Sequence, residues 1–163
     1  MKTMIRLAKK KDLDQIMEII KKAKQYMMDS GNKDQWSGNY PSREVFEQDL
    51  EKEQLYVCED HEKIYGVFVF SIGKEPSYVQ IENGQWLNED PYGTIHRIAS
   101  DGETKGVFKE CFSFCKKKIE NIKIDTHEDN LTMQHVIEKN GFQKCGIVYV
   151  RDHAKRIAYQ YKE

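Results

Sequence analysis

A strand-forming segment, a loop containing a glycine and an amphipathic helix follow one another between residues 92 and 119, and this succession constrains the fold most strongly. Residues 92–100 are rich in strand-forming side chains, and residues 104–119 repeat apolar side chains at helical spacing. The apolar positions of that helix are Val107, Phe108, Cys111, Phe112, Cys115 and Ile119. A helix of this kind buries its apolar face against a sheet, so the segment predicts a layered α/β protein.

The rest of the chain continues this alternation. Strands are predicted at residues 5–7, 55–58, 64–70, 122–126, 142–150 and 156–161, and helices at 13–27, 42–53 and 130–139. Asp12 with Gln15 predicts a capping box for the first helix, and Gly31 lies just past its end. Residues 76–87 fit either a hairpin closed by Asn83-Gly84 or a helical turn opened by Pro76, and we favour the turn. The absence of a linker or repeat indicates one domain, residues 1–163.

Composition excludes several classes of protein. The chain has 26 basic and 27 acidic side chains, so its charge predicts no binding to nucleic acid or to an anionic membrane surface. Without an apolar leader or a membrane-length apolar run, we expect a cytoplasmic protein. The four cysteines are expected to be buried thiols. Cys111 and Cys115 are spaced to bind a metal with His127 or His135, but their apolar helix face favours burial, and we expect no metal.

Two segments in the C-terminal half carry a functional signal. In the first, Gly106 stands at the start of a helix, whose unpaired N–H groups and dipole attract phosphate, and the missing side chain lets a ligand approach the backbone. A plain strand–turn–helix shows the same pattern. In the second, Asn130 precedes a short helix that ends at Asn140-Gly141, which fits an N-cap and a left-handed C-cap.

Together and in this order, the segments 95–108 and 125–142 resemble the GNAT superfamily of N-acetyltransferases, and the resemblance covers most of the chain. It implies a GNAT-type α/β fold: a mixed, mainly antiparallel central sheet of six to seven strands flanked by about four helices. It also implies acetyl-CoA as co-substrate and direct transfer of the acetyl group to an amine. The chain departs from the family pattern at three positions. Glu103 stands where Arg or Gln is usual, Phe108 stands where the family has a small residue, and Ile137 stands where many members keep a Tyr that acts as the acid.

The resemblance assigns the cofactor to two strands, 92–100 and 122–127, that splay apart. The residues it implies for cofactor binding are Ile98, Ala99, Ser100, Thr104, Lys105, Gly106, Val107, Phe108 and Asn130. The backbone at Ile98 and Ser100 would lie beside the acetyl arm, and Asn130 would contact the pantetheine amides. The departures from the pattern keep two alternatives open: a catalytically weak acyl-CoA-binding regulatory module, and an interaction domain without a ligand.

The catalytic groups are less well specified. His96 is the candidate base, because some family members place His or Glu at this position and imidazole titrates near neutral pH. Strand alternation puts His96 and Ile98 on one face, which fits a partly buried histidine equally well. Tyr149 is the substitute candidate for the acid, with packing as the other interpretation.

The acceptor is expected to be a small-molecule or peptide amine. Trp36, Tyr40 and Trp86 are candidates for lining its cleft, although such aromatic side chains are as often part of a core. The nearly neutral charge argues against a strongly anionic acceptor. Family members are often dimers, so a homodimer stays open.

Overall fold

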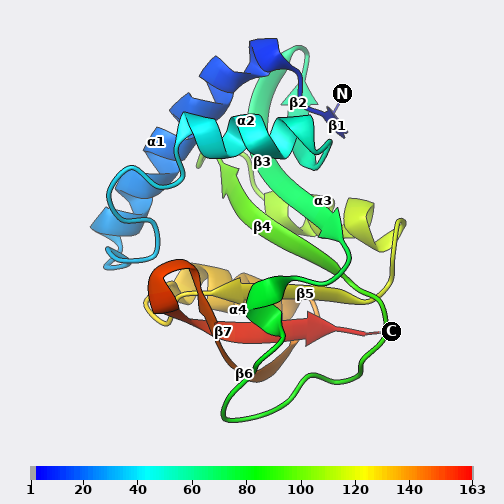
Figure 1. Cartoon of the computed structure of the whole chain (residues 1–163). Helices are drawn as coiled ribbons and strands as arrows, with labels where there is room; N and C mark the ends of the chain where they lie inside the picture. The colour runs from blue at the N-terminus through cyan, green and yellow to red at the C-terminus, as the bar shows by residue number, and fades with distance from the viewer. Residues whose placement is uncertain (1–2, 163) are drawn as a thin grey trace.

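The computed structural model describes residues 3–162, and within them it confirms the expected mixed, mainly antiparallel sheet. Seven strands lie in the order β1-β2-β3-β4-β5-β7-β6. They are β1 Thr3–Leu7, β2 Leu55–Asp60, β3 Lys63–Ile72, β4 Gly93–Ser100, β5 Ile122–Thr126, β6 Gln143–Val150 and β7 Ala154–Tyr161. Neighbouring strands are antiparallel except β4 and β5, which are parallel and lie at the centre of the sheet (Figure 1).

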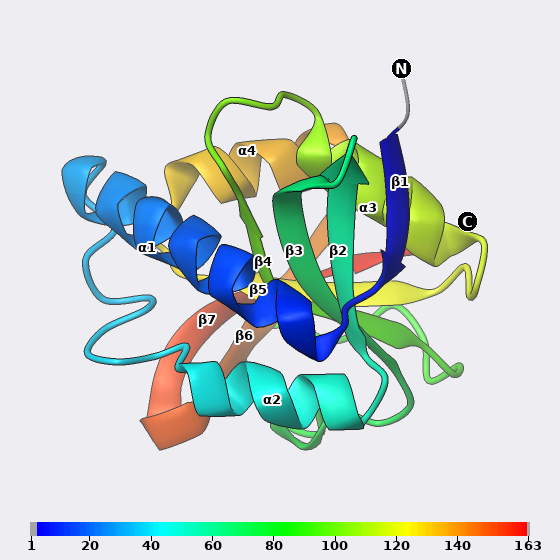
Figure 2. The ribbon, with the colours of Figure 1, turned by 90° about the horizontal axis from the view of Figure 1, so that it is seen from above.

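Four α-helices cover the two faces of the sheet. They are α1 Leu13–Asp29, α2 Arg43–Glu51, α3 Val107–Lys116 and α4 Leu131–Lys139. Figure 2 shows α3 and α4 behind the strands and α1 and α2 in front of them. Strand β3 supplies both cores, because alternate side chains of a strand point to opposite faces. Val67 and Val69 pack with α1 and α2, whereas Phe68 and Phe70 pack with α3 and α4.

Of the two predicted ends of α1, the structure confirms the C-terminal one and contradicts the capping box at the N-terminal one. The predicted capping box is wrong: Asp12 accepts a hydrogen bond from the Lys9 backbone N–H at 2.7 Å and pairs with Arg6 at 2.8 Å. Gln15 turns the other way, and its Oε1 accepts a hydrogen bond from the Ile64 N–H at 3.2 Å. At the other end Gly31 has a φ of +89°, as a left-handed helix terminus requires, and confirms the predicted end of the helix.

The helical turn in the connection between β3 and β4 is shorter than predicted. Pro76 opens a 3-10 turn, but the turn ends at Tyr78 and does not continue to Asn83-Gly84. Glu82 instead exchanges two backbone hydrogen bonds with Ile147 of β6, at 2.9 and 2.8 Å. Gly84 lies so close to this strand that an added Cβ would be 1.9 Å from the Cys145 carbonyl oxygen. The connection therefore pairs with the outer edge of β6, and its Tyr78 packs with Val148 and Ala158 on one face of the sheet.

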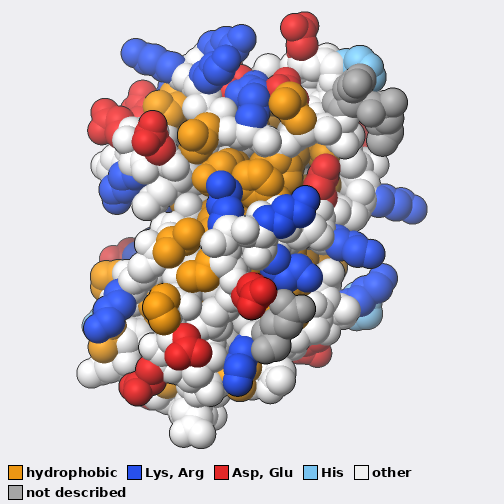
Figure 3. Space-filling model, turned by 90° about the vertical axis from the view of Figure 1, so that its right-hand side faces the viewer, with side chains coloured by type: hydrophobic (Ala, Val, Ile, Leu, Met, Phe, Trp, Pro, Cys, Tyr) orange, Lys and Arg blue, Asp and Glu red, His pale blue; other side chains and the backbone are white. Residues whose placement is uncertain are grey.

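Part of the apolar surface remains exposed. On the side of the molecule that carries both chain ends, hydrophobic side chains gather between lysines and arginines (Figure 3). The Lys118 Nζ lies 5.0 Å from the ring centroid of Phe114, so a lysine covers part of the aromatic surface of α3. Among residues 3–162, no helix is long and apolar enough to cross a membrane.

Candidate functional site

The site lies where β4 and β5 separate. The two parallel strands pair only at Gly93 with Ile122 and Thr94 with Lys123, and beyond these residues they diverge (Figure 1). A β-bulge lies just after this point: Val69 of β3 pairs with His96, whereas Val67 pairs with Ala99, so β4 contains one extra residue. Arg97 in the bulge has a φ of +46°. Two cavities border this separation, and both are lined by Met27, Ile98, Asn130 and Met133.

The first cavity, of about 670 Å³, lies between α1, the end of β4, the start of α3 and the length of α4. We name it the cofactor cavity. Most of the residues that the resemblance assigns to the cofactor line it: Ile98, Ala99, Ser100, Thr104, Gly106, Val107, Phe108 and Asn130. Lys105 belongs to the same loop but is not part of this lining. The Tyr26 hydroxyl of α1 lies 2.9 Å from the Thr132 Oγ1 of α4 and joins the two helices beside the cavity.

The loop before α3 is held open toward the cofactor cavity. The Asp101 carboxylate accepts hydrogen bonds from the N–H groups of Glu103 at 2.9 Å and Thr104 at 3.0 Å, which folds the loop back. Gly106 has a φ of +76°, no atom lies within 4 Å of where its Cβ would be, and no side chain caps the helix. The left-handed glycine explains why α3 begins at Val107 and not at Thr104. An uncapped helix start beside open space suits an anion.

Asn130 caps α4 as predicted. Its Oδ1 accepts a hydrogen bond from the Met133 N–H at 3.0 Å, and its Nδ2 donates to the Gln35 Oε1 at 2.9 Å. The contact of Asn130 with the cofactor stays a prediction. Ile137, which stands in place of the acidic Tyr, is fully buried in the core between α3, α4 and the sheet.

The second cavity, of about 550 Å³, lies between α2, the start of the β3–β4 connection, β4, β5 and the turn between β6 and β7. We name it the acceptor cavity. Trp36 and Tyr40, two of the candidates for the acceptor cleft, line it. Trp86 does not: it packs against Tyr78, and the Lys123 Nζ lies 4.0 Å from its ring centroid. Burial of the Lys123 ammonium group next to the Trp86 ring lowers the pKa of Lys123 to about 8.

Arg97 fastens the bulge of β4 to α2. Its Nε and Nη2 donate to the Asp49 carboxylate at 2.9 and 2.6 Å, and its Nη1 donates to the Tyr40 hydroxyl at 2.7 Å. The Asp49 side chain is only 5% exposed. Such a two-pronged, partly buried pair fixes geometry well. Arg97 therefore holds β4 in the shape that separates it from β5.

His96 lines the acceptor cavity beside two carboxyl groups. Its Nε2 lies 3.4 Å from the Glu75 Oε1, and Asp125 of β5 accepts a hydrogen bond from the Tyr78 hydroxyl at 2.6 Å. Burial lowers the pKa of His96 below its ordinary 6.5 and raises the pKa of Asp125 above its ordinary 3.8. An imidazole with a lowered pKa is neutral near pH 7 and can accept a proton.

The predicted alternation of β4 is wrong at His96. The extra residue in the bulge puts His96 on the same face as Ala99, because they pair with Val69 and Val67, which share a face. Ile98 packs instead against the core on the α3 side. His96 and Ile98 therefore lie on opposite faces of the sheet, and both face the gap between β4 and β5 only because the strands separate there.

Tyr149 is not brought to the site. It belongs to β6, is 39% exposed, and its hydroxyl donates to the Glu82 Oε1 at 3.3 Å. Neither cavity has Tyr149 in its lining. Its position does not fit the predicted role as the acid for the departing thiolate.

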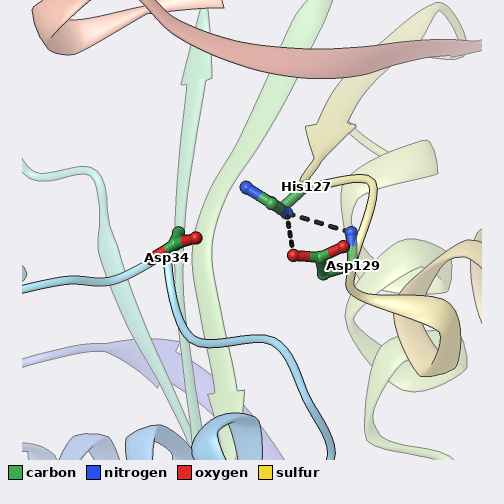
Figure 4. A group of neighbouring side chains, drawn as sticks. All are labelled: Asp34, His127 and Asp129. Atoms are coloured by element: carbon green, nitrogen blue, oxygen red, sulfur yellow. Dashed lines mark hydrogen bonds and ion pairs between the residues drawn. The ribbon is translucent and has the colours of Figure 1, made fainter.

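Two groups of potential metal ligands lie elsewhere. Cys111 and Cys115 are buried as predicted, with the Cys111 Sγ 3.7 Å from the Cys58 Sγ. Asp34, His127 and Asp129 gather beside the start of α4, where Figure 4 shows the His127 ring turned toward Asp129. The His127 Nδ1 accepts a hydrogen bond from the Asp129 N–H at 3.0 Å, so the ring orders the turn before α4.

Sequence reasoning missed several polar groups of the acceptor cavity, chiefly Asp49, Glu75, Asp125, Arg151 and Arg156. Only Asp125 carried a usable signal. It alternates with Ile122 and Ile124, so it had to lie on the face opposite the α3 core. The other four come from α2, the β3–β4 connection, the turn between β6 and β7, and β7, whose proximity depends on the tertiary fold.

No model of a protein family and no curated protein matches the sequence. Among solved structures, a GNAT-family acetyltransferase from Streptococcus agalactiae is 32% identical, with a TM-score of 0.87 over 99% of this chain and 95% of that one. A GNAT-family acetyltransferase from Listeria monocytogenes is 21% identical, with a TM-score of 0.72 over 99% and 95% of the chains. A chain of the NatC complex, solved with Gag peptide and CoA, is 15% identical, with a TM-score of 0.65 over 100% and 99%. The last two show likeness of fold alone.

The fold, the separated central strands and the two joined cavities define an acetyltransferase fold of the GNAT type. The Streptococcus agalactiae relative settles the family, because the identity extends over nearly the whole of both chains. This chain belongs to the GNAT family of acetyltransferases.

Proposed function

We propose that this protein is an acetyl-CoA-dependent N-acetyltransferase that transfers the acetyl group directly to an amine. The observation that carries the proposal is the separation of β4 from β5, which joins a cavity with an anion-suited helix start to a cavity lined by titratable side chains. The CoA in the structurally similar NatC complex supports the choice of donor.

The proposal places the donor in the cofactor cavity. Its pyrophosphate would lie over residues 103–108, where the α3 N–H groups and the space beside Gly106 suit phosphate oxygens. The pantetheine arm would run past Asn130 between β4 and β5, which brings the acetyl group to the bulge. Because a bulge interrupts the ladder between β3 and β4, it leaves main-chain N–H groups near Arg97 to hydrogen-bond the thioester oxygen.

The reaction needs a base on the acceptor side of the gap. An amine arrives as an ammonium ion with a pKa of ~10, and it attacks only after losing a proton. Neutral His96 accepts that proton, directly or through a water molecule, with Glu75 beside the imidazolium that forms. The amine nitrogen then attacks the thioester carbon, and the C–S bond breaks with its electron pair going to sulfur. The second proton lost by the nitrogen passes to the departing CoA thiolate, whose pKa of ~8.5 lets it leave near neutral pH.

The test is to mix the protein with acetyl-CoA and a panel of amines, and to follow free thiol. Thiol release that depends on the amine and is proportional to the protein concentration supports the proposal. A melting temperature raised by CoA with no release of thiol identifies the regulatory-module alternative. A melting temperature unchanged by CoA contradicts the placement of the donor as well.

A further inference from the structure

The acceptor cavity has a surplus of positive charge that the nearly neutral whole chain conceals. Its lining includes five cationic side chains, namely Lys52, Lys74, Arg97, Arg151 and Arg156. It includes three carboxyl groups, namely Asp49, Glu75 and Asp125. Asp49 is already paired with Arg97 through two hydrogen bonds. The remaining lining is therefore unfavourable for a polycationic acceptor and favourable for an acceptor that has its own negative charge.

Two guanidinium groups converge at one end of this cavity. The Nη2 atoms of Arg151 and Arg156 both donate to the main-chain oxygen of Gln35, each at 2.9 Å. Arg151 also stacks on Tyr40, with its Cζ 3.4 Å from the ring centroid. The Arg156 side chain is 3% exposed, so water screens its charge poorly. Two like charges held side by side repel one another unless an anion lies between or beside them.

The Asp125 carboxylate lies near this pair, and it also lines the cavity that contains His96 and Glu75. The Asp125 Oδ1 is 3.8 Å from the Arg156 Nε, too far for a hydrogen bond, while its Oδ2 is held by the Tyr78 hydroxyl. Asp125 lines the same cavity as His96 and Glu75. The arginine pair therefore lies next to the carboxyl groups of Asp125 and Glu75, and a single small molecule can contact both groups.

Resting on the proposed function, we propose that the acceptor is a small amino carboxylate of the α-amino acid class. The amine would face His96 and Glu75, and the carboxylate would be bound by Arg151 and Arg156. The planar guanidinium of Arg151 uses one nitrogen for Gln35 and keeps its other donors for a carboxylate, which arginine binds in a two-pronged geometry. The cavity volume of about 550 Å³ leaves ample room for a molecule of this class.

The experiment compares matched acceptors that differ in the anionic group alone. Thiol release from acetyl-CoA is measured with the common α-amino acids and with the amide of each, and with ethanolamine phosphate against ethanolamine. We expect kcat/KM for the best amino acid to exceed that for its amide by at least ~10-fold, because a charge-assisted pair of hydrogen bonds is lost. Arg151→Gln should abolish that preference by lowering kcat/KM for the amino acid to the value for its amide. Lys155→Gln, which removes a neighbouring exposed cation outside the cavity, should change neither.

The outcomes separate this inference from the proposed function. Amides or decarboxylated amines that react as well as the amino acids overturn the amino carboxylate and leave the acetyltransferase intact. A preference for ethanolamine phosphate over every amino acid overturns the carboxylate and assigns a phosphate to the arginine pair. If no amine reacts, the proposed function fails, and calorimetric titration of the amino acids into the CoA-loaded protein decides. Binding that Arg151→Gln removes supports the inference, and binding that is absent or unaffected by the substitution overturns it.

Discussion

The two cavities that meet between β4 and β5 are built in different ways. The cofactor cavity takes most of its lining from two continuous stretches, residues 98–109 and 130–140, with one side from α1. The acceptor cavity takes short runs of residues from more parts of the chain, namely α2, β4, β5, the β3–β4 connection and the turn between β6 and β7. Backbone conformation sets the first, and long-range side-chain contacts set the second. Substitutions on the two sides should therefore fail in different ways.

The largest effect is expected from His96 in the acceptor cavity. His96→Gln should lower kcat by at least ~100-fold, because it removes a general base, and it should leave the KM for acetyl-CoA unchanged. In the wild type, kcat/KM should fall as the pH drops through the pKa of His96, which burial puts below 6.5, and this limb should be absent from the variant. Exposed His135 provides the control variant, His135→Gln. Unaltered turnover and pH profile would leave a bound water as the proton acceptor.

The next largest effect is expected from Asp49, which pairs with Arg97 in the bulge of β4. Asp49→Ala should reduce the free energy of unfolding by about 3 kcal/mol, since it leaves the Arg97 guanidinium partly buried without its carboxylate. The matched control is Asp14→Ala, which breaks the exposed pair between Asp14 and Arg43 and should cost about 0.5 kcal/mol or less. Urea unfolding measures both. Equal losses in the two variants would show that Arg97 does not hold β4 in place.

On the cofactor side, a substitution should affect binding more than stability. Gly106→Val should weaken CoA binding by at least ~10-fold, because the side chain fills the space beside the α3 N–H groups. Because the residue at position 106 has a positive φ, the valine also adds backbone strain of about 1–2 kcal/mol. Gly38→Val imposes the same kind of strain outside the cofactor cavity, at a φ of +61°, and provides the control. CoA affinity that is equal in the two folded variants would contradict the placement of the pyrophosphate.

The smallest expected effect is at Asn130, which borders both cavities. Asn130→Ala should cost about 1 kcal/mol from the lost cap and also raise the KM for acetyl-CoA. Asn130→Asp keeps the acceptor for the Met133 N–H but loses the amide donor that now reaches Gln35. A KM for acetyl-CoA that is normal in Asn130→Asp would show that the Asn130 amide does not touch the cofactor.

The same contrast explains what the sequence could predict. The succession of strands and helices along the chain, Gly106 at the start of α3 and the Asn130 cap depend on local patterns of apolar spacing and backbone conformation, so they were predictable. The bulge at Arg97 was not, because the one-residue shift that it causes, with Ile95 and Ile98 against the same core, looks in so short a strand like a continuous apolar run. It reversed the face assigned to His96. Trp86 and Tyr149 were misplaced because aromatic side chains pack in cores and at rims as readily as in clefts.

The central claim is that acetyl-CoA enters between β4 and β5 with its pyrophosphate at the start of α3. A crystal structure of the protein with bound CoA tests it most directly. The account predicts pyrophosphate oxygens within hydrogen-bonding distance of main-chain N–H groups in residues 103–108, and the pantetheine arm between the two strands beside Ile98 and Asn130. CoA bound elsewhere, with the gap between β4 and β5 left without ligand, would contradict the claim.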